Sequence, residues 1–206
     1  MENKEKVVAD IPLKCDCGEV QGVAREVTPG SGNRVICYCD DCQAFAIYLG
    51  RADDVLDEHG GTDIFQLTPS QIGITEGQER IRCMRLSDKG MYRWYTECCK
   101  TPIGNTLSAA GPFVGMIHSF MDDRESRDRD LGAVRGYVGT KFSTGALSEK
   151  IRKRGFPLTE VIRTVYKLVL WKIGGKNRPS PFFRADGTPV SEPYVLHSRV
   201  GVDNRR

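Results

Sequence analysis

The sequence has no apolar run long enough to cross a membrane and no apolar stretch near its start. A membrane-spanning helix needs about 20 apolar residues, and the opening MENKEKVVAD is charged where a secretion signal would be apolar. We therefore expect no transmembrane segment and a cytoplasmic protein. Internal repeats and low-complexity tracts are also missing, and 39% hydrophobic with 28% charged residues is typical of a soluble globular domain.

A strong net charge is missing as well, since 30 basic and 27 acidic residues give +3. That balance alone gives no reason to expect nucleic-acid or membrane binding. The charge is nevertheless uneven: residues 141–206 hold 14 Lys and Arg against 5 Asp and Glu, or +9, and residues 1–140 hold 16 against 22, or −6. We predict a domain over 1–140 and a basic C-terminal extension over 141–206 that packs on it.

Cysteine is abundant: the chain has eight, and in a reducing compartment a disulfide framework is improbable. Pairs separated by one or two residues can aim two sulfurs at one zinc ion. The lone Cys83, inside IRCMRL, is expected in the core. The other seven form three groups: Cys15 and Cys17; Cys37, Cys39 and Cys42; and Cys98 and Cys99.

The number of ligands separates two kinds of zinc site. A structural zinc has four protein ligands, whereas a catalytic zinc has three and an open position. The middle group supplies a natural set of three thiolates. Cys15 and Cys17, joined by one or both of Cys98 and Cys99, supply the other set. The sequence therefore predicts two Zn²⁺ ions, one structural and one in an open, catalytic-type site.

Short β-type segments recur through the first 120 residues, which predicts a mainly antiparallel β body. The loop SDKG at 87–90 reads as a hairpin connection with glycine at a left-handed position. The short β-type segments of the first 120 residues are 35–38, 45–49, 63–67, 72–75, 81–86 and 91–95.

The C-terminal third predicts a helix over 157–173, beginning at Pro157 and ended by Gly174. We expect its apolar residues to pack on the β body, although the basic KIRKR at 150–154 would also suit a helix lying on an anionic membrane surface. A proline-rich, extended tail follows and is expected to wrap the body. In the helix predicted over 157–173, the apolar residues at helical spacing are Leu158, Val161, Ile162, Val165 and Val169.

Three motifs in this order, CDCG, CYCDDC about 20 residues later and YTECCKTP, resemble the superfamily of glutathione-dependent formaldehyde-activating enzymes and centromere protein V, over roughly residues 11–120. The resemblance implies a β-tent of small antiparallel sheets with one structural and one three-cysteine zinc. Cys15 and Cys17 would bind the structural ion. The open ion would be held by Cys37, Cys39 and Cys42.

The third motif departs from the family pattern, in which two cysteines separated by two residues precede Gly-Thr. Cys99 falls on the second cysteine, Thr96 on the first, and Lys100 replaces the glycine. The structural site is then completed by Cys98, has three cysteines, or binds zinc weakly. Adjacent residues of a strand point to opposite faces, so Cys98 and Cys99 can share one ion only at a sharp turn. We expect Cys99 first and Cys98 second.

The resemblance implies a carbon–sulfur lyase that acts on S-hydroxymethylglutathione, with glutathione as the partner thiol. Three thiolates on Zn²⁺ leave a charge near −1, which suits a thiol better than a hard ligand. Tyr38, Asp40 or Asp41 could move a proton, although aspartate in such a loop more often forms turns. Gln43 is a candidate donor to the site.

Glutathione carboxylates would need cationic partners. The sequence offers four arginines without showing which of them face the site: Arg34, Arg82, Arg85 and Arg93. Each is more often an ordinary surface residue.

The alternative function is a binding module in which zinc only holds the fold, while residues 141–206 contact nucleic acid or an anionic membrane. A three-ligand set favours the enzyme, because a scaffold needs no open position. The oligomeric state is left open.

Overall fold

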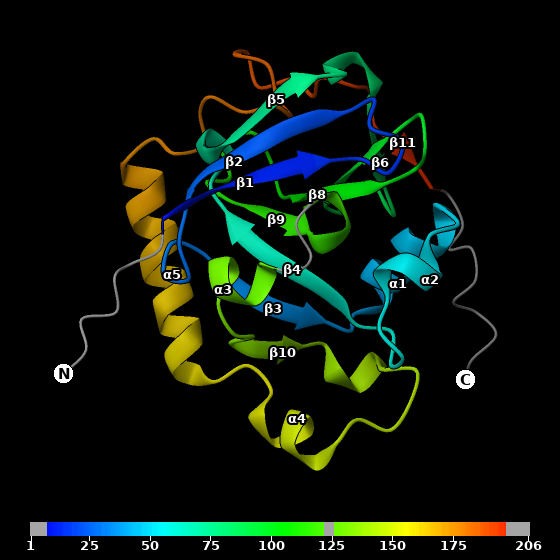
Figure 1. Cartoon of the computed structure of the whole chain (residues 1–206), viewed down its shortest axis with the longest axis vertical. Helices are drawn as coiled ribbons and strands as arrows, with labels where there is room; N and C mark the ends of the chain where they lie inside the picture. The colour runs from blue at the N-terminus through cyan, green and yellow to red at the C-terminus, as the bar shows by residue number, and fades with distance from the viewer. Residues whose placement is uncertain (1–7, 122–125, 197–206) are drawn as a thin grey trace.

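The computed structural model describes residues 8–121 and 126–196, and its fold is mainly β with a C-terminal helix, as predicted. The smaller of two sheets is antiparallel and has three strands (Figure 1). Its first strand is half-buried: Ile11 and Leu13 point into the core, and Pro12 and Lys14 are exposed. The order of this sheet is β1 (Ala9–Lys14), β2 (Gln21–Val27) and β5 (Ile72–Glu76).

The larger sheet has eight strands and carries most of the fold. Its central strands pair antiparallel, and a parallel strand closes each edge. The order is β10 (Gly136–Val138), β3 (Asn33–Cys37), β4 (Thr62–Leu67), β9 (Val114–Ile117), β8 (Pro102–Thr106), β7 (Tyr92–Thr96), β6 (Ile81–Arg85) and β11 (Tyr194–Val195).

The main core surrounds Trp94 on β7, which is fully buried. Two rings of the C-terminal tail belong to this core. Phe182 stacks on Trp94 with ring centroids 5.1 Å apart, and Phe183 meets Trp94 edge to face at 5.5 Å. The tail therefore contributes buried aromatic area to the same core as the sheets.

Four short helices connect the strands: α1 (Asp40–Tyr48), α2 (Ala52–Val55), α3 (Arg127–Leu131) and α4 (Glu149–Arg154). The strand predicted over 45–49 is wrong, because most of that segment belongs to α1. Residues 42–46 of α1 are all buried, and a short segment that is buried all round has no periodicity to separate helix from strand.

The predicted hairpin between β6 and β7 is present, since the two strands pair antiparallel. The left-handed glycine predicted there is wrong, because Gly90 is not among the residues with positive φ. The Gly90 amide instead donates to the Ser87 carbonyl at 3.0 Å, a bond that closes an ordinary β-turn.

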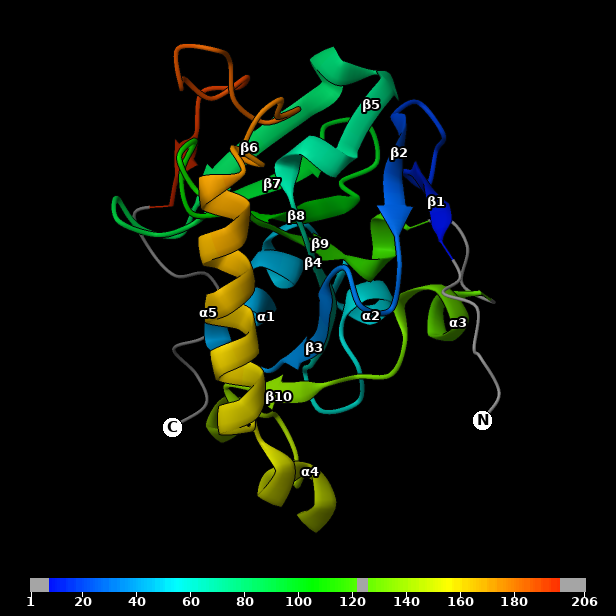
Figure 2. The same cartoon turned by 90° about the vertical axis from the view of Figure 1, so that its left-hand side faces the viewer.

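The long helix α5 (Leu158–Ile173) agrees with the predicted helix, but its predicted orientation is wrong. No residue of α5 is buried, and its apolar stripe faces solvent rather than the β body. Figures 1 and 2 show α5 running along the outside of the molecule. Within residues 8–121 and 126–196, no helix has the length and apolar character needed to cross a membrane.

Candidate metal centres

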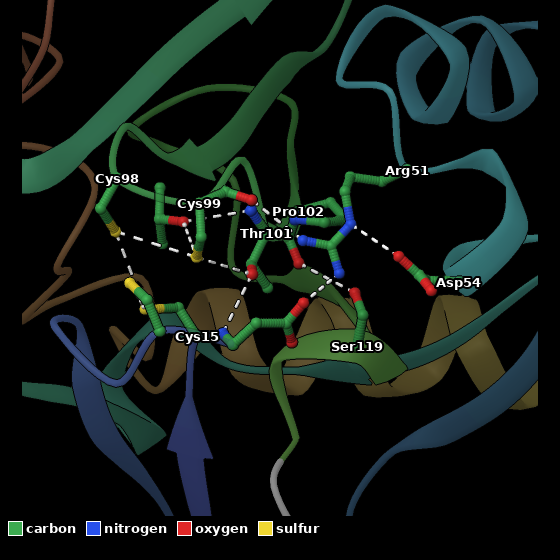
Figure 3. Close-up of polar contacts among 11 residues, drawn as sticks. Cys15, Arg51, Asp54, Cys98, Cys99, Thr101, Pro102 and Ser119 are labelled. Atoms are coloured by element: carbon green, nitrogen blue, oxygen red, sulfur yellow. Dashed lines mark hydrogen bonds and ion pairs between the residues drawn. The ribbon is translucent and has the colours of Figure 1, made fainter.

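Four cysteines meet where the β1–β2 turn approaches the β7–β8 turn (Figure 3). The Sγ atom of Cys15 lies 3.5 Å from that of Cys17 and 3.8 Å from that of Cys98, and the Sγ atoms of Cys98 and Cys99 are 3.9 Å apart. A tetrahedron with Zn–S bonds of about 2.3 Å has edges of about 3.8 Å. This four-cysteine cluster therefore has the dimensions of a closed structural site.

The turn between β7 and β8 brings both of its cysteines to the cluster. Lys100 has a left-handed φ of 58°, and its amide donates to the Thr96 carbonyl at 3.0 Å. The chain thus reverses at the point where two adjacent cysteines can share one ion. Of the three arrangements left open by the sequence, the structure has the one with four sulfurs, including both Cys98 and Cys99.

Cys15, Cys98 and Cys99 of this cluster differ in acidity. Burial raises the pKa of Cys99, but hydrogen bonds from the hydroxyls of Thr101 and Thr96 and from backbone amides outweigh burial and lower the pKa to about 6. Burial raises the pKa of Cys98 to about 12, and burial also raises that of Cys15. Cys99 therefore ionises before Cys15 and Cys98, and thiolate is the form that binds a metal.

Groups that the sequence did not single out brace this cluster. Arg51 donates to the carbonyl of Cys99 at 2.9 Å and pairs with Asp16, which lies between Cys15 and Cys17. The Asp16 amide donates to the Thr101 hydroxyl at 3.2 Å. These contacts join the two cysteine turns without using a sulfur (Figure 3). The partners in these contacts are 35, 48 and 85 positions apart in the chain, so no local motif marks them.

Three further cysteines meet where β3 passes into α1. The Sγ atom of Cys37, the last residue of β3, lies 3.3 Å from that of Cys39 and 3.7 Å from that of Cys42. Cys39 caps the N-terminus of α1 and Cys42 is in its first turn. In the described residues this second group, the three-cysteine cluster, has three candidate ligand atoms. Its spacing also fits one tetrahedral ion, with one position left over.

Without a cation the three thiols resist ionisation together. Shared hydrogen bonding with Cys39 raises the pKa of Cys37 to about 11, and shared hydrogen bonding with Cys37, together with burial, raises that of Cys42 to about 12. The contact with Cys37 favours the thiolate of Cys39, but Cys42 and burial outweigh it and raise the pKa of Cys39 to about 12. A divalent cation would reverse this preference, because bound metal deprotonates a coordinating thiol.

Arg93 on β7 contacts the three-cysteine cluster, and it is 2% exposed. Its guanidinium points to the Sγ of Cys42 at 3.9 Å and pairs with Asp41 at 3.4 Å. It also donates to the Asn105 side-chain oxygen at 3.2 Å. The sequence offered Arg93 as one of four possible partners for glutathione carboxylates and favoured an ordinary surface position for each. The surface position is wrong for Arg93 and for Arg34, which is also buried.

The other residues singled out near this cluster have separate partners. Gln43 donates to the carbonyls of Tyr38 and Phe142 at 2.8 and 2.9 Å, and so holds the loop between the cysteines. The Tyr38 hydroxyl donates to Asp57 at 3.2 Å, and burial together with Asp57 raises the pKa of Tyr38. A side-chain oxygen of Asp40 accepts the amide of Asp41. Tyr38 therefore directs its hydroxyl to a carboxylate rather than to a sulfur.

The remaining arginines considered for glutathione are already engaged. Arg34 is buried and pairs with Asp63 and Asp128. Arg82 pairs with Glu97, and Arg85 donates to the Gly90 carbonyl at 3.0 Å. A cavity of about 390 Å³ beside Gln43 is lined by the carboxylates Asp53, Asp57 and Glu58. The field in that cavity opposes a ligand with carboxylate groups.

Two cysteine clusters that can each hold a metal ion, on a mainly β fold, define a candidate metalloprotein. The model of DUF6151, a family of unknown function, matches residues 5–193. The chain therefore belongs to the DUF6151 family.

No curated protein matches the sequence. Among solved structures, the chain is similar to a Rhodobacter sphaeroides protein whose crystal structure was a target of Northeast Structural Genomics. The sequences are 16% identical, the match covers 62% of this chain and 100% of the other, and the TM-score is 0.42.

Proposed function

We propose that the protein binds two Zn²⁺ ions, a structural ion at the four-cysteine cluster and an exchangeable ion at the three-cysteine cluster. The observation that carries this proposal is that the two compact clusters differ in their number of sulfur atoms. One has four and the other has three, and in each the sulfur atoms are spaced like the edges of a zinc tetrahedron. A closed site holds the fold, and a three-ligand site leaves a position for a substrate.

Zinc at the three-cysteine cluster would supply a Lewis-acidic position for a thiol or a carbonyl. The protein's own residues set the charge around that position. Three thiolates and a divalent ion total −1, and the guanidinium of Arg93 beside Cys42 adds a positive charge that it shares with the Asp41 carboxylate. The N-terminal end of α1 adds partial positive charge at Cys39 and Cys42. Both positive contributions reduce the repulsion that a further thiolate would meet at this site.

The activity we propose for this site is that of a carbon–sulfur lyase on a thiol–formaldehyde adduct of the S-hydroxymethylglutathione type, as in the formaldehyde-activating superfamily that the motifs resemble. Two features support the resemblance. Lys100 has the left-handed φ that glycine favours at the matching family position, and Cys98 joins the four-cysteine cluster where Thr96 replaces the family's cysteine.

In the lyase direction the adduct hydroxyl loses its proton, the C–S bond breaks, and formaldehyde and a thiolate leave. We propose Asp41 as the proton acceptor, because its carboxylate is held by Arg93 next to Cys42. Because Arg34, Arg82 and Arg85 already have partners, we expect a thiol of low negative charge to bind better than glutathione, and both kinds are tested.

The first test is the number of zinc ions per chain, measured by native mass spectrometry on wild type and Cys42→Ser. We expect two ions in wild type and one in the variant. The matched control is Cys83→Ser, a buried cysteine outside both clusters, which is expected to retain two. One ion that survives Cys42→Ser would contradict an occupied three-cysteine site.

The second test uses cobalt at the three-cysteine site, because its visible absorption reports the coordination sphere. Glutathione and the uncharged 2-mercaptoethanol are added separately, and at least one is expected to change the spectrum of wild type but not that of Cys42→Ser. A spectrum indifferent to both thiols would contradict thiol binding. The formaldehyde adduct of the thiol that binds is then used as substrate. If it breaks down no faster with the protein than in buffer, the lyase is contradicted and a thiol carrier is left.

A further inference from the structure

The helix α5 attaches to the body through polar side chains. The Asn33 side-chain amide donates to the Thr164 hydroxyl at 2.8 Å. Lys167 donates to the carbonyls of Gly30 and Gly32 at 2.7 and 2.8 Å, and Arg163 donates to Gly30 at 3.3 Å. The half-buried residues of the helix are Glu160, Arg163, Thr164, Lys167, Leu168 and Trp171. Four of these six are polar, so this amphipathic helix is turned with most of its polar side inward.

The opposite side of α5 is an apolar stripe that is exposed to solvent, and Figure 2 shows the helix on the outer side of the molecule. Its members recur at the spacing of one helix face and are between 37 and 80% exposed. The stripe is contiguous along the whole helix, which is the pattern of an interaction surface rather than of scattered surface residues. It comprises Leu158, Val161, Ile162, Val165, Tyr166, Val169, Leu170 and Ile173.

Both ends of the stripe are basic. The short helix α4, which precedes α5 in the chain and lies at its lower end in Figures 1 and 2, exposes Lys150, Arg152 and Lys153. Beyond the other end, Lys176 and Arg178 are exposed. Residues 141–206 carry the net +9 that the acidic body lacks. The partner of the stripe must therefore be apolar along its middle and negatively charged around it.

A second copy of this chain does not meet that requirement. If two α5 helices packed antiparallel, the basic α4 of each copy would meet Lys176 and Arg178 of the other. If they packed parallel, α4 would meet α4. Positive charge faces positive charge in both orientations, and like charges at an interface oppose association.

We propose that the stripe of α5 binds the surface of a membrane that contains anionic lipids, with the helix lying parallel to the surface. Its 16 residues span about 24 Å, less than the hydrocarbon core, so the helix lies on the membrane rather than through it. The aliphatic side chains enter the boundary between headgroups and acyl chains, and the basic groups at the two ends meet anionic headgroups. A nucleic acid would satisfy the basic groups but leave the aliphatic side chains without an apolar partner.

The test is sedimentation of the full-length protein with vesicles of phosphatidylcholine containing about 30% phosphatidylserine. Tyr166→Asp on the stripe is compared with Tyr194→Asp on β11, which lies away from α5 (Figure 1). The two tyrosines are 62 and 56% exposed, so the substitutions match in chemistry and exposure. We expect wild type and Tyr194→Asp to bind alike, and Tyr166→Asp to bind about tenfold more weakly.

The electrostatic part is tested with Lys150→Glu/Arg152→Glu and with vesicles of phosphatidylcholine alone, each of which is expected to weaken binding about tenfold. Equal binding by Tyr166→Asp and Tyr194→Asp would overturn the proposal. So would a wild-type protein that ignores the vesicles but sediments as a dimer that Tyr166→Asp dissociates, since the occupant would then be a second copy. Binding to a short RNA duplex that is unaffected by Tyr166→Asp, in a protein that ignores vesicles, would overturn it in favour of nucleic acid.

Discussion

Arg93 is a buried guanidinium that contacts Cys42, Asp41 and Asn105. A buried charge is costly unless it is compensated. The Asp41 carboxylate compensates it in part, and thiolates at the three-cysteine cluster would complete the compensation. The favourable charge interaction between Arg93 and the cysteines should therefore depend on the cysteines being ionised.

Arg93→Met removes this charge while keeping an elongated side chain. We expect zinc affinity at the three-cysteine cluster to fall by about 10- to 100-fold, the range typical for groups that support metal ligands. The measurement is competition with a chromophoric chelator. Arg82→Met on the neighbouring strand β6 removes a partly exposed arginine that pairs with Glu97, and its affinity should equal that of wild type. The same affinity in both variants would show that Arg93 has no part in metal binding.

The sequence identified the sulfur atoms of both clusters but not their surroundings. Cysteines one to three positions apart are visible as motifs, and the structure brings the seven together in the predicted groups. Arg93 reaches Cys42 from β7, 51 positions away in the chain, and Asn105 on β8 accepts a hydrogen bond from Arg93. Contacts between strands of this kind depend on sheet register, and no local spacing reports register.

At the scale of single elements, α5 shows how a correct element can be given the wrong orientation. Its bounds follow from proline, glycine and the 3.6-residue period, which are local signals. The period shows that a helix has two faces, but not which face meets the body. Thr164, Lys167 and Arg163 find carbonyl and amide partners around residues 30–33, and that loop was not predicted to approach the helix.

Lys167 should make the attachment of α5 depend on pH. Burial, with the nearby charges of Arg163 and Arg135, lowers its pKa to about 8, whereas an unfolded lysine titrates near 10.4. Between these values the unfolded chain binds more protons, so this group's contribution to stability is complete above about pH 10.4 and is lost as the pH falls through about 8. We expect the free energy of unfolding of wild type, relative to Lys167→Met, to rise by about 1 kcal/mol across this window, after discounting for a half-exposed group.

Urea unfolding of the zinc-loaded proteins from pH 7.5 to 10.5 measures this difference. Thr164→Val is the control, because it removes a neighbouring hydroxyl that does not titrate. The difference in free energy of unfolding between this variant and wild type should therefore be constant with pH. If the difference in free energy of unfolding between wild type and Lys167→Met is also constant with pH, a lowered pKa of Lys167 would be contradicted.

For the whole molecule, the four-cysteine cluster joins the smaller sheet to the larger one, because Cys15 and Cys17 follow β1 whereas Cys98 and Cys99 follow β7. Binding of a structural metal contributes directly to folding free energy. Removing the metal should therefore destabilise the whole fold rather than one loop.

We expect a strong chelator to lower the melting temperature by about 10 °C or more, since each kcal/mol corresponds to about 2–4 °C in a domain of this size. Cys98→Ser should melt near the chelated wild type and respond little to the chelator. Cys83→Ser, a core cysteine outside both clusters, should retain the full response. Identical melting with and without chelator in wild type would contradict a structural metal.

The position of the four-cysteine cluster in the chain has a consequence for covalent integrity. Cys15 and Cys98 are 83 positions apart, so a metal bound between them closes everything from β2 to β7 into a ring. A single peptide cut inside that ring would leave two fragments that the metal still holds together. The protein would then behave as a folded pair of polypeptides, and the fragments would separate only when the metal is withdrawn.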